Sequence, residues 1–179
     1  MALHTSELLE RARNIRLVCF DVDGTLTDGR LYFDSEGRES KAFNVHDGQG
    51  LRLLEDNGIA VAFITARASE SASARARDLR LSHVFIGVKD KAACLKLLCE
   101  RLNITTQQAA FMGDDVPDLA AMKISGLACV PANAHQWMFD HADWIAAKNG
   151  GEGAARALCD LILESQGLMP AILKKWGVA

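Results

Sequence analysis

The sequence predicts an α/β fold in which a parallel, Rossmann-like sheet is covered by helices on both faces. Short apolar runs recur along the 179 residues, and they alternate with stretches whose apolar residues lie three and four positions apart. Most of these runs end at a polar residue, and ligand sites of parallel sheets lie at that end of the strands. The connections look too short for a second domain, so we expect a single domain over residues 1–179 without a cap domain.

Six apolar runs are expected to form the strands of this sheet. They are Ile15–Phe20, Ala60–Ile64, His83–Ile86, Ala109–Met112, Leu127–Val130 and the short Trp144–Ile145. Helical spacing is clear between the third and fourth runs, at Leu95 and Leu98, and again near the C-terminus, at Leu158 and Ile162. Because strand and helix alternate, the strands should be parallel and buried on both faces.

One segment interrupts the alternation directly after the first strand. Residues 31–33 and 38–44 flank the turn-forming sequence Asp34-Ser35-Glu36-Gly37, which predicts a β-hairpin over about residues 31–44. Near the other end, one last helix follows the turn-like residues 149–151. Residues 167–179 are then expected to form a C-terminal tail.

Composition and charge exclude several classes of protein. The formal net charge of −3 offers no basic stripe for nucleic acid. The longest apolar run, Ile59–Ile64, is far too short to span a bilayer. Residues 1–16 lack the pattern of a signal peptide, and none of the five cysteines forms a Cys-x-x-Cys pair. We therefore expect a cytoplasmic protein with reduced thiols that binds neither nucleic acid nor membrane.

Two carboxylates lie at the end of the first strand, in the sequence Asp21-Val22-Asp23-Gly24-Thr25. Side chains two residues apart in an extended segment point to the same side. Asp21 and Asp23 would then repel each other unless a cation or a shared proton compensates. Taken alone, the pair fits a solvated loop with an Asp-Gly turn equally well.

A second acidic cluster, Asp114-Asp115 with Asp118 three residues on, follows the fourth strand. Pro117 suits an early helix position, so Asp118 should lie in the first turn of a helix, where the helix dipole alone would favour an acidic residue. Together, Asp21, Asp23 and Asp114 would bring three carboxylates to one point. Hard oxygen ligands of this kind suit Mg²⁺.

Two further strand ends supply groups that can hold a phosphate. Thr65 ends the second strand and precedes Ala66-Arg67, where a hydroxyl and the N–H groups of a helix start can bind phosphate oxygens. Lys91 begins the helix after the third strand and offers a point charge, which Asp118 can hold in place. Taken alone, Thr65 is explained as a helix cap and Lys91 as a surface lysine.

The complete set of motifs resembles the haloacid dehalogenase superfamily of aspartate-nucleophile phosphatases, over residues 16–166. The resemblance implies that Asp21 attacks phosphorus to form an aspartyl-phosphate and that Asp23 acts as general acid and then base. It further implies Mg²⁺ held by the Asp21 carboxylate, the Asp23 backbone carbonyl and Asp114. The phosphate and the substrate would be bound by Thr65, Ala66, Arg67 and Lys91. Supporting roles would fall to Thr25, Asp115 and Asp118.

Two other stretches, residues 41–50 and 150–154, resemble the capless subfamily that contains 3-deoxy-D-manno-octulosonate 8-phosphate phosphatase. This closer resemblance implies that an acidic sugar phosphate of lipopolysaccharide precursor synthesis is the substrate. It also implies a homotetramer in which hairpins form a central barrel and a neighbouring subunit closes each site.

The chain departs from the subfamily pattern at His46, Ala66 and Glu152. These departures leave open a nine-carbon keto-deoxy sugar acid phosphate of the sialic-acid type as the substrate. Arg67 and Arg156 are candidate partners for a substrate carboxylate.

Two other classes of protein share part of this pattern. A signalling receiver domain also forms an aspartyl-phosphate, but it lacks an acid–base residue at the position of Asp23, and its motifs follow a different order. A non-catalytic scaffold protein would be expected to have lost catalytic positions, and here every one of them is filled.

Overall fold

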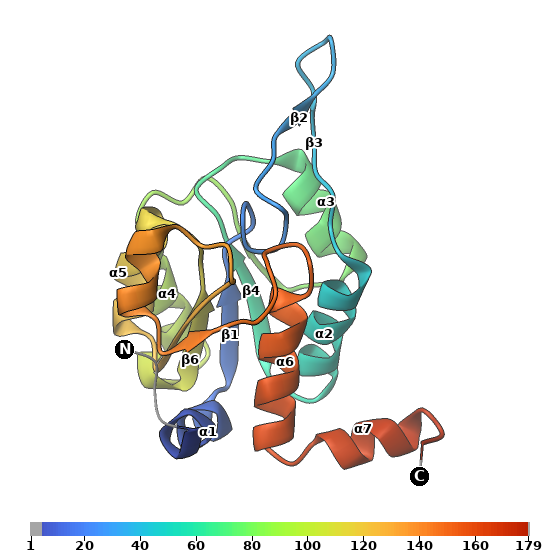
Figure 1. Cartoon of the computed structure of the whole chain (residues 1–179), viewed down its shortest axis with the longest axis vertical. Helices are drawn as coiled ribbons and strands as arrows, with labels where there is room; N and C mark the ends of the chain where they lie inside the picture. The colour runs from blue at the N-terminus through green and yellow to red at the C-terminus, as the bar shows by residue number, and fades with distance from the viewer. Residues whose placement is uncertain (1–4, 179) are drawn as a thin grey trace.

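The central sheet has six strands in the order β5-β4-β1-β6-β7-β8, and all of its pairings are parallel. The computed structural model describes residues 5–178, so residues 1–4 and 179 of the predicted domain and tail lie outside it. The strands are β1 (Leu17–Phe20), β4 (Ala60–Ile64), β5 (His83–Phe85), β6 (Ala109–Met112), β7 (Leu127–Val130) and β8 (Trp144–Ile145). The predicted parallel sheet is therefore confirmed (Figure 1).

The central strands are buried on both faces, which explains why their sequences are continuously apolar. Every residue of β1, β6 and β7 is buried, whereas the edge strand β5 is only half-buried. Phe20 and Phe63 on one face, and Phe111 on the other, are among the largest fully buried side chains. The packing of these buried strands holds their carboxyl ends in place at one edge of the sheet.

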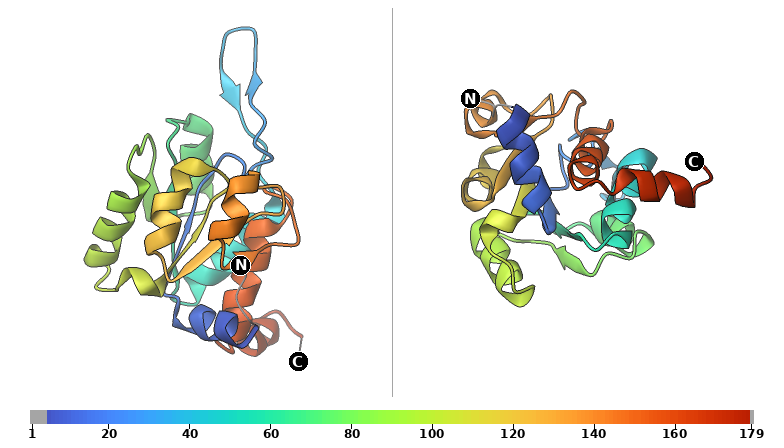
Figure 2. Two further views of the ribbon diagram at one scale, coloured as in Figure 1. Left: turned by 60° about the vertical axis from the view of Figure 1, so that its left-hand side comes forward. Right: turned by 90° about the horizontal axis from the view of Figure 1, so that it is seen from below.

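Helices cover both faces of the sheet (Figure 2). They are α1 (Thr5–Asn14), α2 (Val45–Asp56), α3 (Glu70–Asp78), α4 (Lys91–Arg101), α5 (Leu119–Ile124), α6 (Ala154–Ser165) and α7 (Met169–Lys175). One core cluster joins α1, α2, α3 and α6 to the sheet, and the other joins α4 and α5 to its opposite face. None of the described helices is long and apolar enough to cross a membrane.

The predicted hairpin is present, and it projects from the end of the sheet at which the strands terminate (Figure 1). Its ladder is short, pairing β2 (Tyr32–Phe33) with β3 (Glu39–Ser40) in antiparallel register. At its tip, the Asp34 carboxylate accepts the backbone N–H groups of Glu36 and Arg38. Phe33 is 59% exposed, so the hairpin presents apolar surface away from the core.

The C-terminal tail contains a helix that the sequence reading did not predict. Gly167, with φ of +69°, ends α6, and Pro170 then lies in the first turn of α7. Ile172 is buried, and Leu168 and Met169 pack against the same core cluster. The expectation of a plain tail after one last helix was therefore wrong, because apolar residues three and four apart anchor this segment to the domain.

Candidate functional site

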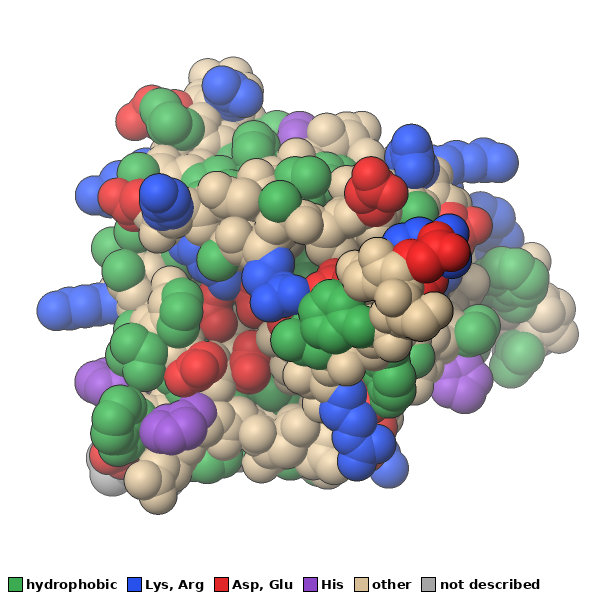
Figure 3. All heavy atoms as spheres, turned by 90° about the horizontal axis from the view of Figure 1, so that it is seen from above, with side chains coloured by type: hydrophobic (Ala, Val, Ile, Leu, Met, Phe, Trp, Pro, Cys, Tyr) green, Lys and Arg blue, Asp and Glu red, His purple; other side chains and the backbone are tan. Residues whose placement is uncertain are grey.

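The polar residues predicted at the strand ends lie around one cavity of about 290 Å³ beyond β1, β4 and β6. Seen from the hairpin end, acidic side chains gather in a hollow beside Lys and Arg side chains (Figure 3). The cavity is lined by Asp21, Asp23, Gly24, Gly29, Thr65, Ala66, Arg67, Lys91, Asp114, Asp115, Pro117 and Asp118. The fold thus brings together the side chains that the sequence placed on separate segments.

Three carboxylates form the centre of this cavity. Asp21, Asp114 and Asp118 each present an oxygen within 4.8 Å of the other two. Burial, with the charge of Asp118, raises the pKa of Asp21 to about 6. Burial, with the charges of Asp21 and Asp118, raises the pKa of Asp114 to about 7. Crowded anionic oxygens of this kind are the donor set of a hard divalent cation.

The side chain of Asp23 is outside that cluster, and Asp118 is inside it. The expectation that the carboxylates of Asp21, Asp23 and Asp114 would meet at one point was therefore wrong for Asp23, because its side chain pairs with Lys41 instead. A metal-binding role for its backbone carbonyl stays a prediction. The Asp118 carboxylate already accepts the backbone N–H groups of Asp114 and Asp115, at 3.1 and 3.4 Å. Asp118 therefore holds the turn after β6 in shape, and Asp21 and Asp114 remain the carboxylates available to a metal.

Lys91 lies between two of the three acids. Its Nζ is 2.6 Å from Asp118 Oδ1 and 2.7 Å from Asp21 Oδ1, and its side chain is only 2% exposed. Burial acts to lower the pKa of Lys91, but Asp118 and Asp21 outweigh it and the pKa is raised. Lys91 therefore carries a positive charge inside the cavity, and the predicted pairing with Asp118 is present in the structure.

The Asp114 carboxylate is held in position by Gly24 and Thr25, which follow β1. The fully buried Thr25 donates its hydroxyl to Asp114 Oδ1 at 3.3 Å. Gly24 has φ of +83°, and a Cβ there would lie 2.1 Å from Asp114 Oδ2. Only glycine suits this position, because a side chain would displace the carboxylate. The exposed Asp115 accepts the N–H of Val116 and begins the turn Val116–Asp118.

Thr65 faces the cavity, but it does not stand at a helix start. Its hydroxyl accepts the backbone N–H of Arg67 at 3.4 Å, and helix α3 begins only at Glu70, capped by Ser69. The expected helix N-terminus at Thr65-Ala66-Arg67 was therefore wrong. The chain first runs through a short loop, and the Ser69 hydroxyl then accepts the backbone N–H of Ala72 in the first turn of the helix.

Two residues at the base of the hairpin belong to the site and were missed as site residues. The Lys41 side chain is fully buried and contacts the carboxylates of Asp23 and Glu39. Glu39 also accepts from Arg67 and Ser69. Although burial opposes it, hydrogen bonds from Lys41, Arg67 and Ser69 lower the pKa of Glu39 to about 2. Nothing in their local sequence separates them from ordinary surface charges of a hairpin.

Two of the residues at which the chain departs from the subfamily pattern, and one of the two candidate arginines, do not line the cavity. His46 is exposed at the start of α2, and Glu152 is exposed and accepts from Asn149 at 3.0 Å. Arg156 pairs with Asp160 along α6, at 2.8 Å. Of the two candidate arginines, Arg67 and Arg156, only Arg67 lines the cavity within this chain.

Comparison with known proteins identifies the family. The model of the haloacid dehalogenase-like hydrolases matches residues 84–158. The 3-deoxy-D-manno-octulosonate 8-phosphate phosphatase KdsC of Escherichia coli (strain K12) is 39% identical over 163 residues, 91% of this chain and 87% of that protein. The chain belongs to the haloacid dehalogenase-like hydrolases. KdsC of Yersinia pestis is 40% identical over 89% of this chain and 86% of its own length.

Several solved structures superpose closely on this chain. A hypothetical protein from Xanthomonas campestris is 54% identical, with a TM-score of 0.93 over 95% of this chain and 93% of that chain. The 3-deoxy-D-manno-octulosonate 8-phosphate phosphatase of Moraxella catarrhalis, in complex with magnesium, phosphate and KDO, is 39% identical. Its TM-score is 0.94 over 97% of this chain and 99% of that chain.

The crowded carboxylates predict that the metal-free hydrolase loses stability as the pH rises from 3.8 to about 7. Between these values the folded state keeps a proton on Asp114 that the unfolded state has released. For Asp114 alone, each pH unit in this range should therefore cost up to ~1.4 kcal/mol of unfolding free energy, and Asp21 should add to the loss up to about pH 6. Melting curves in chelator across this range measure the slope, and added Mg²⁺ should restore stability at pH 7.

Asp114→Asn should reduce that slope, and Asp140→Asn, an exposed residue outside the cavity, should keep it. An unchanged slope in Asp114→Asn would mean that this carboxylate does not titrate in the crowded site.

Proposed function

We propose that the chain is a Mg²⁺-dependent phosphatase that hydrolyses 3-deoxy-D-manno-octulosonate 8-phosphate through an aspartyl-phosphate on Asp21. The observation that carries this proposal is the cavity in which Asp21, Asp114 and Asp118 surround one point beside Lys91. It is supported by relatives of that name that align over nine-tenths of the chain, and by the structure from Moraxella catarrhalis with magnesium, phosphate and KDO.

The residues of the cavity suit a magnesium ion. Asp21 and Asp114 have raised pKa values because their charges are buried and close together, and a divalent cation would relieve that repulsion. The Asp21 carboxylate, the Asp114 carboxylate and the Asp23 backbone carbonyl would hold it. When bound, Mg²⁺ supplies positive charge that offsets the oxygens of the transferred phosphoryl group.

Asp21 is the proposed nucleophile because it lies at the end of β1 with its carboxylate facing the cavity. In the first step an Asp21 oxygen attacks phosphorus, the bond to the sugar oxygen breaks, and Asp23 gives that oxygen a proton. In the second step water attacks phosphorus while Asp23 takes a proton from it, the Asp21 oxygen–phosphorus bond breaks, and phosphate leaves. Lys91 and the Thr65 hydroxyl would hold phosphoryl oxygens, so that charge is balanced throughout.

Asp23 also decides between hydrolysis and a persistent phosphoryl group. Its carboxylate lines the same cavity as Asp21, which a signalling receiver domain would not need. Membership of a hydrolase family whose relatives are named phosphatases also argues against a receiver and against a scaffold without activity.

We also propose that the protein is a cytoplasmic homotetramer in which a neighbouring subunit closes each site. The cavity is open, and no cap segment covers it among residues 5–178. The hairpin exposes Leu31, Tyr32 and Phe33, apolar side chains that would be buried by contact with other copies. A substrate carboxylate would then meet Arg67 and residues from the neighbour.

The eight-carbon sugar phosphate should be hydrolysed only with Mg²⁺ and only with Asp21 in place. Asp21→Asn is expected to lower kcat at least about 1,000-fold, because the nucleophile is lost. The control variant Asp140→Asn should keep wild-type activity. Phosphate release, measured with and without chelator, gives the result, and full activity in Asp21→Asn would contradict the assigned nucleophile.

The same assay on a nine-carbon keto-deoxy sugar acid 9-phosphate decides the substrate. The proposal expects kcat/KM to favour the eight-carbon ester by about tenfold or more. The opposite preference would assign the nine-carbon substrate and leave the reaction type unchanged.

Phe33→Asp should dissociate the oligomer, because it places a charge in an apolar contact of the hairpin. Leu97→Asp is the matched control, since Leu97 is similarly exposed (54%) on α4, away from the hairpin. Light scattering should show smaller particles for Phe33→Asp alone, with activity reduced about tenfold or more. Dissociated subunits with full activity would show that each site is complete within one chain.

A further inference from the structure

Lys41 is a buried lysine outside regular structure, in the segment that joins the hairpin to α2. Its side chain is 0% exposed, whereas most lysine ammonium groups lie in water. A buried ammonium group is costly unless it is paired and hydrogen-bonded. The fold must therefore hold this side chain in place through specific partners.

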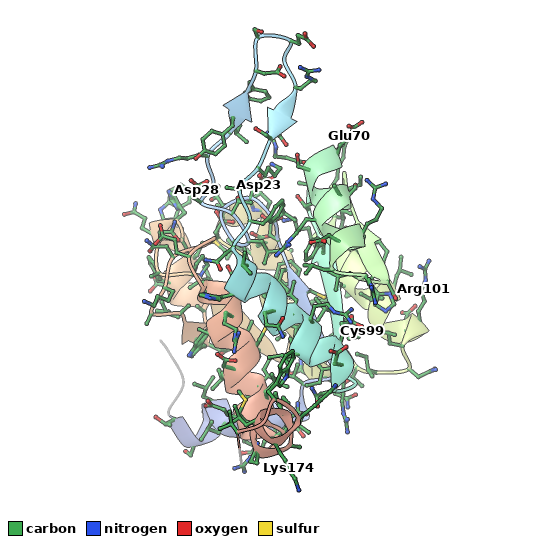
Figure 4. All side chains as sticks on the ribbon, turned by 90° about the vertical axis from the view of Figure 1, so that its right-hand side faces the viewer. Asp23, Asp28, Glu70, Cys99, Arg101 and Lys174 are labelled. Carbon is green, nitrogen blue, oxygen red and sulfur yellow. The ribbon has the colours of Figure 1, made fainter. Side chains whose placement is uncertain are left out.

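Those partners are two carboxylates. The Lys41 ammonium donates to Asp23 Oδ1 and lies 2.9 Å from Glu39 Oε1. Asp23 lies where the hairpin leaves the domain (Figure 4). One partner thus comes from the loop after β1, which lines the cavity, and the other from β3 of the hairpin.

The contact occupies only one oxygen of Asp23. Asp23 Oδ2 is buried and has no hydrogen-bond partner among residues 5–178, although Arg67 Nε lies 3.7 Å from it. A carboxylate held at one oxygen cannot rotate freely, and its other oxygen keeps a fixed direction. This is the arrangement that a proton-transfer group requires, because such transfer depends on geometry before anything else.

Glu39 holds Lys41 from the other side. Its carboxylate also accepts from Arg67 and, at 3.0 Å, from Ser69 Oγ, while its backbone carbonyl accepts from Ser71 Oγ at 3.3 Å. The base of the hairpin is therefore tied to the start of α3, and the lysine cannot follow Asp23 if that side chain turns away.

We propose that Lys41 is a positioning residue for proton transfer by Asp23, an inference that rests on the proposed phosphatase function. Lys41 fixes Oδ1 and keeps its own proton throughout. Asp23 Oδ2–H gives its proton to the sugar oxygen while the Asp21 oxygen–phosphorus bond forms and the phosphorus–sugar oxygen bond breaks. Asp23 is left as the carboxylate that next accepts a proton from water.

The leaving group separates this role from a structural one. A sugar alkoxide must be protonated as it departs, whereas p-nitrophenolate and acetate leave readily without a proton. Loss of Asp23 positioning should therefore lower kcat/KM for the sugar phosphate and spare p-nitrophenyl phosphate and acetyl phosphate. Disruption of the hairpin base, or of phosphate binding, should lower kcat/KM for all three.

The test compares Lys41→Met with Lys96→Met, which removes an exposed lysine of α4 outside the cavity. For Lys41→Met we expect kcat/KM for the sugar phosphate to fall about 100-fold, the lower range for loss of acid–base assistance. Hydrolysis of the two activated phosphates should stay within about threefold of wild type, and Lys41→Arg, which keeps the charge, should recover about tenfold. An equal fall for all three substrates, or no fall, would overturn the proposal.

Two further measurements keep the test decisive. In an Asp23→Asn background, Lys41→Met should add no more than about threefold to the loss on the sugar phosphate, because both changes remove one interaction; a full additional 100-fold loss would contradict it. If Lys41→Met does not fold, Lys41→Gln is assayed with the same expected selectivity. A wild-type protein that hydrolyses none of these phosphates would instead reject the proposed function.

Discussion

The ammonium group of Lys91 lies between the carboxylates of Asp21 and Asp118, within 2.7 Å of both. These side chains come from the end of β1, the start of α4 and the turn after β6, so one buried cation joins three separate segments. Without it, three acids within 4.8 Å of one another would repel in a largely buried site. The lysine compensates only part of that charge. The negative charge that remains favours binding of a divalent cation, and this combination suits phosphoryl transfer at the edge of the sheet.

The sheet and its acidic edge were predictable because they depend on local patterns. The apolar runs predicted β4, β6 and β7 with the same first and last residues that the structure shows. Ligand sites lie at the carboxyl ends of parallel strands, and this rule correctly predicted that Asp21, Thr65 and Asp114 lie together. Helix α7 was missed because its few apolar residues matter only once they meet the core. Lys41 was missed for a similar reason, since its partner Asp23 lies 18 residues away and meets it only after the hairpin folds back.

The hairpin links two parts of the proposed function in one segment. Its far end exposes Phe33 and neighbouring apolar side chains, which suit contact with other copies of the chain. Its base carries Glu39 and Lys41, which bind Arg67 and Asp23 at the cavity. A capless hydrolase must exclude water from its site without a domain of its own for the purpose. We propose that the same hairpin brings a neighbouring subunit to the site and, through Lys41, orients Asp23, which protonates the leaving sugar oxygen.

In the proposed mechanism the phosphoryl group passes through Asp21. Borohydride reduces an aspartyl-phosphate to homoserine, so quenching the enzyme with borohydride during turnover marks the residue that carried the phosphoryl group. Peptide mass spectrometry should then find homoserine at position 21, only when both substrate and Mg²⁺ are present. Full turnover without modification at position 21, or homoserine at position 23 instead, would contradict this mechanism.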